Sequence, residues 1–168
     1  MTPARLCLVT LGVYGSTEDS FFGALQNNGV DTFVDVRQRR GLRGSKYAYA
    51  NSTRLQERLA ELGIRYVHLK DLAPTPSVRD RQKEADKRTG VAKRDRDRLG
   101  DAFVEAYRSE VLEPYDLAAF FEVLPDDTRV AALFCVERAP AACHRSLLAE
   151  ALREKYDLEV DHVDTATE

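Results

Sequence analysis

The chain has 168 residues, enough for one domain of the usual ~100–200 residues with a single core. Its formal net charge of −3 provides no overall positive surface for nucleic acid, and no apolar run reaches the ~18 residues that a membrane span needs. Three cysteines without a regular framework of spacings favour a reducing compartment, so we expect one cytoplasmic domain over residues 1–168 that has no membrane partner.

The first part of the chain alternates short apolar runs with amphipathic segments. Residues 5–11 (RLCLVTL) predict a buried strand. A capped helix follows and ends at Gly29, because glycine readily adopts the left-handed conformation that stops a helix. A second strand is expected at residues 32–36 and a third at residues 64–69, with an amphipathic helix between them.

Residues 73–127 form a predicted helical insertion between the third and fourth strands. Its first half is densely charged and predicts a solvated flap, whereas its second half has apolar residues at helical spacing and predicts packed helices, the last at residues 114–124. The almost entirely apolar residues 129–135 predict a fourth strand that is covered on both faces. A helix from about residue 143 to 155 and a strand at residues 158–163 complete the set.

This alternation predicts a three-layer α/β fold with a mostly parallel sheet of about five strands. In such sheets, ligands bind beyond the carboxyl ends of the strands. The unusual polar residues lie at or just beyond those ends: Asp35 and Arg37 at the second strand, His68 at the third, and Cys135 and Glu137 at the fourth. Because purely structural polar residues would be scattered over both edges, we expect a functional site at this edge.

The last long helix begins with Cys143, His144 and Arg145. Backbone N–H groups without intrahelical partners then lie beside a thiol, an imidazole and a guanidinium, which suits an anion and a reactive thiolate. Cys143 and His144 are therefore catalytic candidates, and Arg145 is a candidate phosphate clamp. Buried cysteines more often serve as small apolar residues, and that role is favoured for Cys143 taken alone and more strongly for Cys135.

Glu137 and His68 are the predicted acid–base residues. A carboxylate just beyond a buried strand either works in a site or forms a salt bridge, and Arg37 or Arg145 can supply that partner for Glu137. His68 lies close to the end of its strand, and an imidazole exchanges protons near neutral pH. Asp35 must be partnered because it is buried, by Arg37 or by a backbone turn, and we place it in the site in an orienting role.

A basic loop follows the second strand. Within ten residues that contain no acid, the chain places Arg37, Arg39, Arg40, Arg43 and Lys46. Such a loop predicts anion binding, so the four arginines and Arg145 are the candidate ligand-binding residues.

The spacing of the cysteines does not suggest a metal. Zinc can in principle be bound by Cys135, Glu137, Cys143 and His144. Structural zinc sites usually contain close pairs such as C-x2-C, however, whereas the two cysteines are eight positions apart, so we expect no metal and no cofactor. Nothing in the chain indicates its oligomeric state.

Four stretches, in this order, resemble the domain-of-unknown-function family numbered 488: TLGVYGSTEDSFFGAL, FVDVRQRRGLR, NSTRLQERLAELGIRYVHL and LFCVERAPAACHRSLLAEAL. The most specific element is C-x-E-x5-C-H-R at residues 135–145, supported by V-D-V-R at residues 34–37. The resemblance implies a Rossmann-like fold and a presumed site lined by these motif residues, but no reaction. Val13 and Tyr14 replace a histidine and serine that are commoner in the family, and Gln38 replaces its usual proline.

Together these features predict an enzyme that binds a phosphate-bearing ligand, such as a nucleotide or a nucleic-acid end, at the carboxyl edge of the sheet. The alternative is a non-enzymatic nucleic-acid-binding module that uses the basic loop at residues 37–46 and the charged flap at residues 79–98. A binding module should present basic residues over an extended face, whereas an enzyme pocket should be small and concave and contain acids.

Overall fold

The computed structural model of the chain describes residues 6–90 and 99–167. Its centre is a five-stranded sheet in the order β3-β2-β4-β1-β5, and every neighbouring pair of strands is parallel. The strands are β1 (Cys7–Leu11), β2 (Thr32–Asp35), β3 (Arg65–His68), β4 (Val130–Phe134) and β5 (Glu159–Val163). This arrangement confirms the predicted α/β class and all five strands, although residue 5 of the first predicted strand lies outside the described residues.

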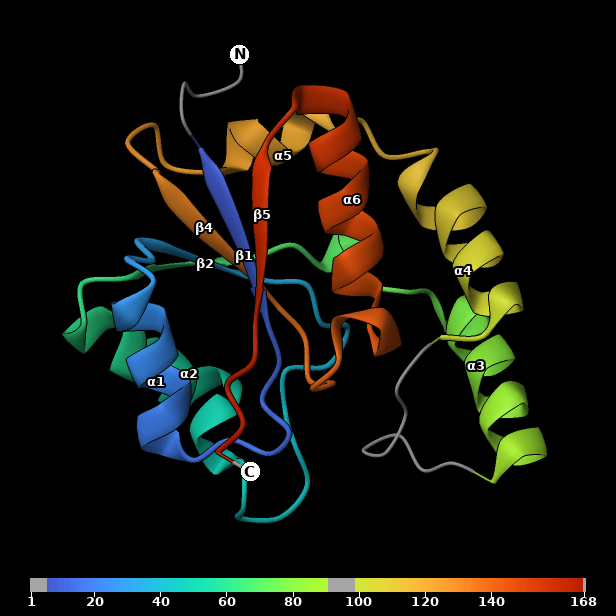
Figure 1. Ribbon diagram of the computed structural model, residues 1–168, viewed down its shortest axis with the longest axis horizontal. Helices are drawn as coiled ribbons and strands as arrows, with labels where there is room; N and C mark the ends of the chain where they lie inside the picture. Colours follow the sequence, from blue (N-terminus) through green and yellow to red (C-terminus); the bar gives the residue numbers. More distant parts are fainter. Residues whose placement is uncertain (1–5, 91–98, 168) are drawn as a thin grey trace.

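Helices cover both faces of the sheet (Figure 1). On one face lie α1 (Glu18–Asn27) and α2 (Ser52–Glu61), and on the other lies α6 (His144–Tyr156), which contacts β1, β4 and β5. This division follows from the strand order, because right-handed crossovers that run in opposite directions along a sheet lie on opposite faces.

The insertion between β3 and β4 is helical, as predicted, and lies on the α6 side of the sheet (Figure 1). It contains α3 (Pro76–Thr89), α4 (Asp101–Tyr107), which continues into a π-helical turn, and α5 (Ala118–Val123). The helix expected at residues 114–124 is shorter than predicted, because the backbone turns before it begins at Ala118. The part of the predicted flap at residues 91–98 lies outside the described residues.

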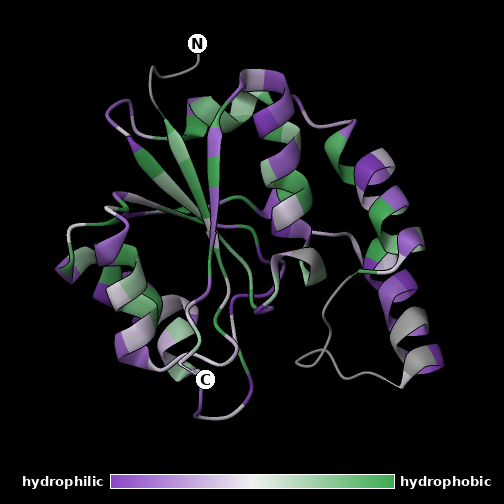
Figure 2. Ribbon diagram, viewed as in Figure 1, coloured by the Kyte–Doolittle hydropathy of each residue, from purple (hydrophilic) through white to green (hydrophobic). Residues whose placement is uncertain are grey.

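The core lies between the central strands and the helices. The strand β4 is apolar along its length, and α1 and α2 turn their apolar residues inward (Figure 2). Phe21, Phe33 and Phe134 are fully buried and pack with ring centroids 5.1–6.3 Å apart. The edge strand β5 is largely exposed, which matches its more polar sequence. The central strands are therefore the rigid support for the loops that follow them.

The chain leaves β2 toward the face covered by α2 and leaves β4 toward the face covered by α6. Because β2 and β4 are neighbours, their outgoing loops diverge and open a crevice at the carboxyl edge of the sheet, the usual ligand position in this fold class. No helix in the described part of the chain is long and apolar enough to cross a membrane.

Candidate functional site

A cavity of about 420 Å³ occupies the crevice between β2 and β4. One wall comes from the sheet edge and the start of α6, and we call it the sheet wall: it includes Arg37, Cys135, Val136, Glu137, Cys143 and His144. The facing residues come from the insertion, and we call them the insertion wall: Pro74, Arg79, Gln82, Lys83, Leu99 and Phe103. Gln38, Arg39, Gly41 and Leu42 of the basic loop complete the lining.

Asp35 and Arg37 form a buried ion pair at the end of β2. Arg37 donates from Nε to Oδ1 at 2.9 Å and from Nη2 to Oδ2 at 2.8 Å, and its backbone N–H also reaches Oδ1. The hydroxyl of Tyr66 donates to Oδ2 at 2.6 Å. Asp35 therefore has the orienting function that its burial predicts, and it is not among the lining residues of the cavity.

Arg37 retains one unused donor. It is 3% exposed, and its Nη1 atom is buried without a hydrogen-bond partner among the residues that the structure describes. Its guanidinium carbon also lies 4.7 Å from the centroid of the Phe134 ring. A buried charged donor without a partner is costly, so Arg37 is ready to donate to an anionic oxygen of a ligand.

His68 supports the backbone of the loop that begins at Arg37. Its Nε2 lies 2.8 Å from the carbonyl oxygen of Arg37, and since a carbonyl only accepts, Nε2 carries the proton. His68 is half-buried and does not line the cavity. The structure thus places this predicted acid–base residue as a support for the Arg37 backbone.

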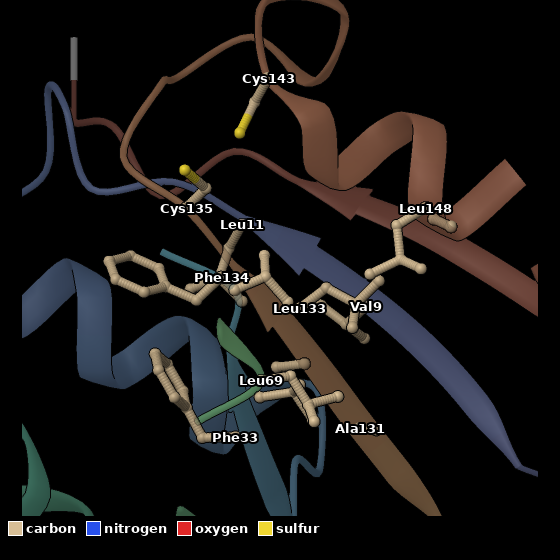
Figure 3. Close-up of a cluster of buried hydrophobic side chains, with 14 of the residues drawn as sticks. Val9, Leu11, Phe33, Leu69, Ala131, Leu133, Phe134, Cys135, Cys143 and Leu148 are labelled. Atoms are coloured by element: carbon tan, nitrogen blue, oxygen red, sulfur yellow. The ribbon is translucent and has the colours of Figure 1, made fainter. Parts of the chain in front are cut away.

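Cys135, Cys143 and His144 converge at the base of the sheet wall. Their sulfur and ring nitrogen atoms all lie within 4.8 Å of one another, and Figure 3 shows the two sulfur atoms turned toward each other. The Nδ1 atom of His144 lies 3.7 Å from the Cys143 sulfur, while its Nε2 bonds to the carbonyl oxygen of Val36 at 2.8 Å. The two cysteines, eight positions apart in the chain, thus meet because β4 ends beside the start of α6.

The electrostatics of this cluster favour a deprotonated sulfur. Burial opposes ionisation of Cys143, but a hydrogen bond with Cys135 and the charges of His144 and Arg145 outweigh it and hold the pKa of Cys143 well below its ordinary value. Burial likewise lowers the pKa of His144, whereas the neighbouring Cys143 sulfur raises it, with a net increase. Cys135, for which a purely structural role was favoured, is part of the cluster.

Glu137 lines the cavity and is 5% exposed. Its backbone is fixed from two sides. Arg145 donates from Nη1 to the Glu137 carbonyl oxygen at 2.6 Å, and a side chain added at Gly12 would place its Cβ only 1.9 Å from that same oxygen. Gly12 is therefore required for β1 and the loop after β4 to approach each other.

The comparisons with known proteins identify one family. The family model described as Domain of unknown function DUF488 matches residues 17–152. The chain belongs to this family. No curated protein and no solved structure matched it.

The DUF488 motif residues divide between two roles. Arg37, Cys135, Glu137, Cys143 and His144 line the cavity. Arg145 does not: it is fully buried, and it donates to the carbonyl oxygens of Glu137 and Arg138, so in this structure it shapes the loop after β4 instead of clamping a ligand. A motif position alone could not separate these roles, because both depend on the geometry of the same loop.

The arginines of the basic loop in this DUF488 member also lie in different places. Arg39 is exposed and lines the cavity. Arg40 is turned toward the Tyr66 hydroxyl, 3.5 Å away, and lines a separate, shallow surface hollow beside α2. Arg43 is exposed at the tip of the loop and lines neither of these cavities. The predicted ligand-binding set is therefore brought together at Arg37 and Arg39 and not at Arg40, Arg43 or Arg145.

The insertion wall was not predicted as part of the site. Arg79, Gln82 and Lys83 lie about one helical turn apart or less on α3 and reach the cavity together. Within the highly charged α3 sequence these residues look like any solvated helix face. Arg79 is half-buried and Gln82 is buried, unlike the residues of a solvated helix face. Their burial follows from the packing of α3 against α4, which the sequence alone does not show.

Proposed function

We propose that the chain is an enzyme that binds a phosphate-bearing small molecule, such as a nucleotide or a nucleic-acid end, in the cavity between β2 and β4. The observation that carries the proposal is the buried Nη1 of Arg37, unpartnered among the described residues, on a cavity that Arg39, Arg79 and Lys83 also line. Phosphate oxygens are the natural partners of such a group of guanidinium and ammonium donors.

The shape of the cavity favours a small molecule over an extended polymer. Its volume of about 420 Å³ falls in the ~300–1,000 Å³ range of small-molecule sites. Glu137 contributes a carboxylate among the cations, which a simple nucleic-acid clamp does not need. A concave site with an acid inside is the arrangement expected of an enzyme pocket.

The residues have different roles in this proposal. Arg37 anchors the phosphate, and Asp35 fixes the plane of its guanidinium. Arg39, on the basic loop, contributes a second positive charge at the rim. Glu137 is the acid–base group. Cys143 and His144 are the reactive residues at the bottom of the cavity.

Binding measurements on two matched variants test this function. Calorimetry with inorganic phosphate and a panel of mononucleotides should show that Arg39→Ala weakens binding by about tenfold, since hydrogen bonds to charged groups contribute ~1.5–3 kcal/mol. Arg43→Ala removes the same charge from the same loop but away from the cavity, so it should leave the affinity within about twofold.

The nucleic-acid-binding module predicts a different pattern. In that case the unmodified chain binds duplex DNA, and each arginine that contacts a phosphate contributes ~0.9 to the slope of log affinity against log salt. Equal losses of duplex binding in Arg39→Ala and Arg43→Ala, without any affinity for mononucleotides, would replace the enzyme proposal by this alternative.

A further inference from the structure

The cluster of Cys135, Cys143 and His144 has the composition of a metal site. Their candidate ligand atoms lie within 4.8 Å of one another, and the three residues are 7%, 1% and 4% exposed. The sulfur atoms face each other across the gap between the end of β4 and the start of α6 (Figure 3). Thiolates are soft donors and an imidazole is a borderline one, a set that suits zinc and not magnesium or calcium.

The orientation of His144 leaves the correct nitrogen available. Its Nε2–H donates to the Val36 carbonyl oxygen at 2.8 Å, so in the neutral ring Nδ1 holds the free lone pair. That nitrogen is the one that faces the Cys143 sulfur. Histidine ligands of metals are usually fixed in this way, by donation of the other ring N–H to a carbonyl or carboxylate.

The separation of the donor atoms fits a tetrahedral ion. With Zn–S near ~2.3 Å and Zn–N near ~2.0–2.1 Å, the edge between a sulfur and a nitrogen ligand of a tetrahedral site is about 3.6 Å. The Cys143 sulfur and His144 Nδ1 are 3.7 Å apart, so this edge needs almost no adjustment.

The charge balance also favours an ion. Both cysteines are buried, and an isolated thiolate is expensive to bury. Two thiolates and one divalent cation are neutral together, which removes that cost. The fully buried Tyr107, whose ring centroid lies 5.4 Å from that of His144, closes the site on one side with an apolar surface.

We propose that Cys135 Sγ, Cys143 Sγ and His144 Nδ1 bind one zinc ion, with the fourth coordination position open to the cavity. All three residues line the cavity, so the open position lies on the same space as Arg37 and Glu137. A site with three protein ligands and one open position is the type that binds a water or a substrate oxygen. Binding of Zn²⁺ to the neutral residues releases two thiol protons and leaves a neutral site with two sulfur ligands and one nitrogen ligand.

The spacing of the two cysteines in the sequence pointed away from a metal, since sequence patterns identify zinc sites by close pairs. Here the fold brings Cys135 and Cys143 together, because the strand β4 and the following helix α6 place the two ends of a short loop side by side. The metal site does not depend on the proposed phosphate ligand. Its link to that ligand, through a phosphate oxygen at the open position, does rest on the proposed function.

The first test uses the unmodified chain without a histidine tag. After removal of metals by a chelator, titration with Zn²⁺ should show one equivalent bound per chain. Binding at about pH 7 should release about two protons per ion, because the bound ligands are two thiolates and a neutral imidazole. Titration with Co²⁺ should produce the thiolate charge-transfer bands and the intense visible bands of a tetrahedral site. These readouts are independent of any enzymatic activity.

Variants assign the ligands. Cys135→Ala and Cys143→Ala keep small apolar side chains in the core, and each should weaken Zn²⁺ binding by about 100-fold or more through loss of a ligand. Cys7→Ala is the matched control, because Cys7 lies in β1 with its thiol 3.5 Å from Glu159, and this variant should keep the Zn²⁺ affinity of the unmodified chain. Circular dichroism verifies the fold of each variant.

Reduced, folded protein that binds no stoichiometric Zn²⁺, or a Co²⁺ spectrum without thiolate bands, would overturn the metal site without reference to any variant. Unchanged affinity in Cys135→Ala and Cys143→Ala would do the same. If Zn²⁺ binds as expected but neither phosphate nor a mononucleotide binds, the proposed function fails and the metal site stands.

Discussion

The two walls of the cavity differ in how their residues are held. On the sheet wall, Arg37 is fixed by three hydrogen bonds to the buried Asp35, and the loop that carries Glu137 is fixed by Arg145. On the insertion wall, Lys83 is exposed, and its ion pair with Asp80 of α3 is a surface contact at 4.0 Å. The comparison indicates that Arg37 and the Glu137 loop set the geometry of the cavity, whereas Lys83 adjusts its charge.

The largest effect is expected where the sheet wall loses its buried ion pair. Asp35→Ala leaves Arg37 charged and without its partner, and breaking a buried pair in this way costs about 3–5 kcal/mol. The exposed pair of Arg54 and Glu18, at 2.7 Å, is the control: Glu18→Gln should cost under about 1 kcal/mol. Urea unfolding measures both, and equal losses would show that the sheet wall is no more constrained than the surface.

A second large effect is expected at the contact between β1 and the loop after β4. Gly12→Ala would force its new Cβ against the Glu137 carbonyl and should destabilise the fold by about 3 kcal/mol, at the upper end of overpacking effects. A methyl group added at Gly23 in α1 would meet no atom of another described segment within 4 Å, so Gly23→Ala should instead stabilise by about 0.5–1 kcal/mol. Changes in unfolding free energy of the same sign for both variants would contradict this packing.

Substitution of an exposed residue on the insertion wall should change the affinity for the ligand and leave the stability of the fold almost unchanged. Lys83→Gln removes an exposed charge from the cavity and should weaken mononucleotide binding by about threefold to tenfold, while the free energy of unfolding stays within ~0.5 kcal/mol. Lys87→Gln, one turn further along α3 and away from the cavity, should change neither quantity. A loss of affinity that is the same in both variants would mean that the overall charge of α3, and not the cavity, attracts the ligand.

The smallest effect is expected in the free energy of unfolding at alkaline pH, where Tyr66 loses the proton that it donates to Asp35. Burial, together with the hydrogen bond to Asp35, raises the pKa of Tyr66 to about 12, against its ordinary value of 10.0. Since the folded state binds this proton more tightly, the contribution of Tyr66 to stability is complete below about pH 10 and is lost as the pH rises to about 12. The free energy of unfolding should therefore decline more steeply across this range in the unmodified chain than in Tyr66→Phe; parallel curves would contradict the hydrogen bond.

The sequence was sufficient to predict the strands and the edge of the sheet at which the cavity lies. Apolar runs indicate the strands, and polar residues such as Asp35 and Glu137, at or just beyond the ends of such runs, must lie at the carboxyl edge of a parallel sheet. The pairing of Asp35 with Arg37 was also accessible, because a buried aspartate requires a partner close at hand.

The remaining features depend on how the elements and the loops between them pack together. Cys135 joins Cys143 only because β4 and α6 meet, and Arg79 reaches the cavity only because α3 packs on α4. Arg145 shows the converse, since an arginine at a helix start suggests an anion, yet its guanidinium is used by backbone carbonyls of the preceding loop. The packing of elements decided the first two cases and the direction of a side chain decided the third, and the sequence encodes neither locally.

The most direct test of the account is the position of a bound anion. A crystal structure of the chain grown with tungstate, which mimics phosphate and is located by its anomalous scattering, would show where the strongest anion site lies. We predict tungstate inside the cavity, within hydrogen-bond distance of Arg37 Nη1 and near Arg39. Tungstate found only outside the cavity, for example at Arg43 on the tip of the basic loop, would contradict it.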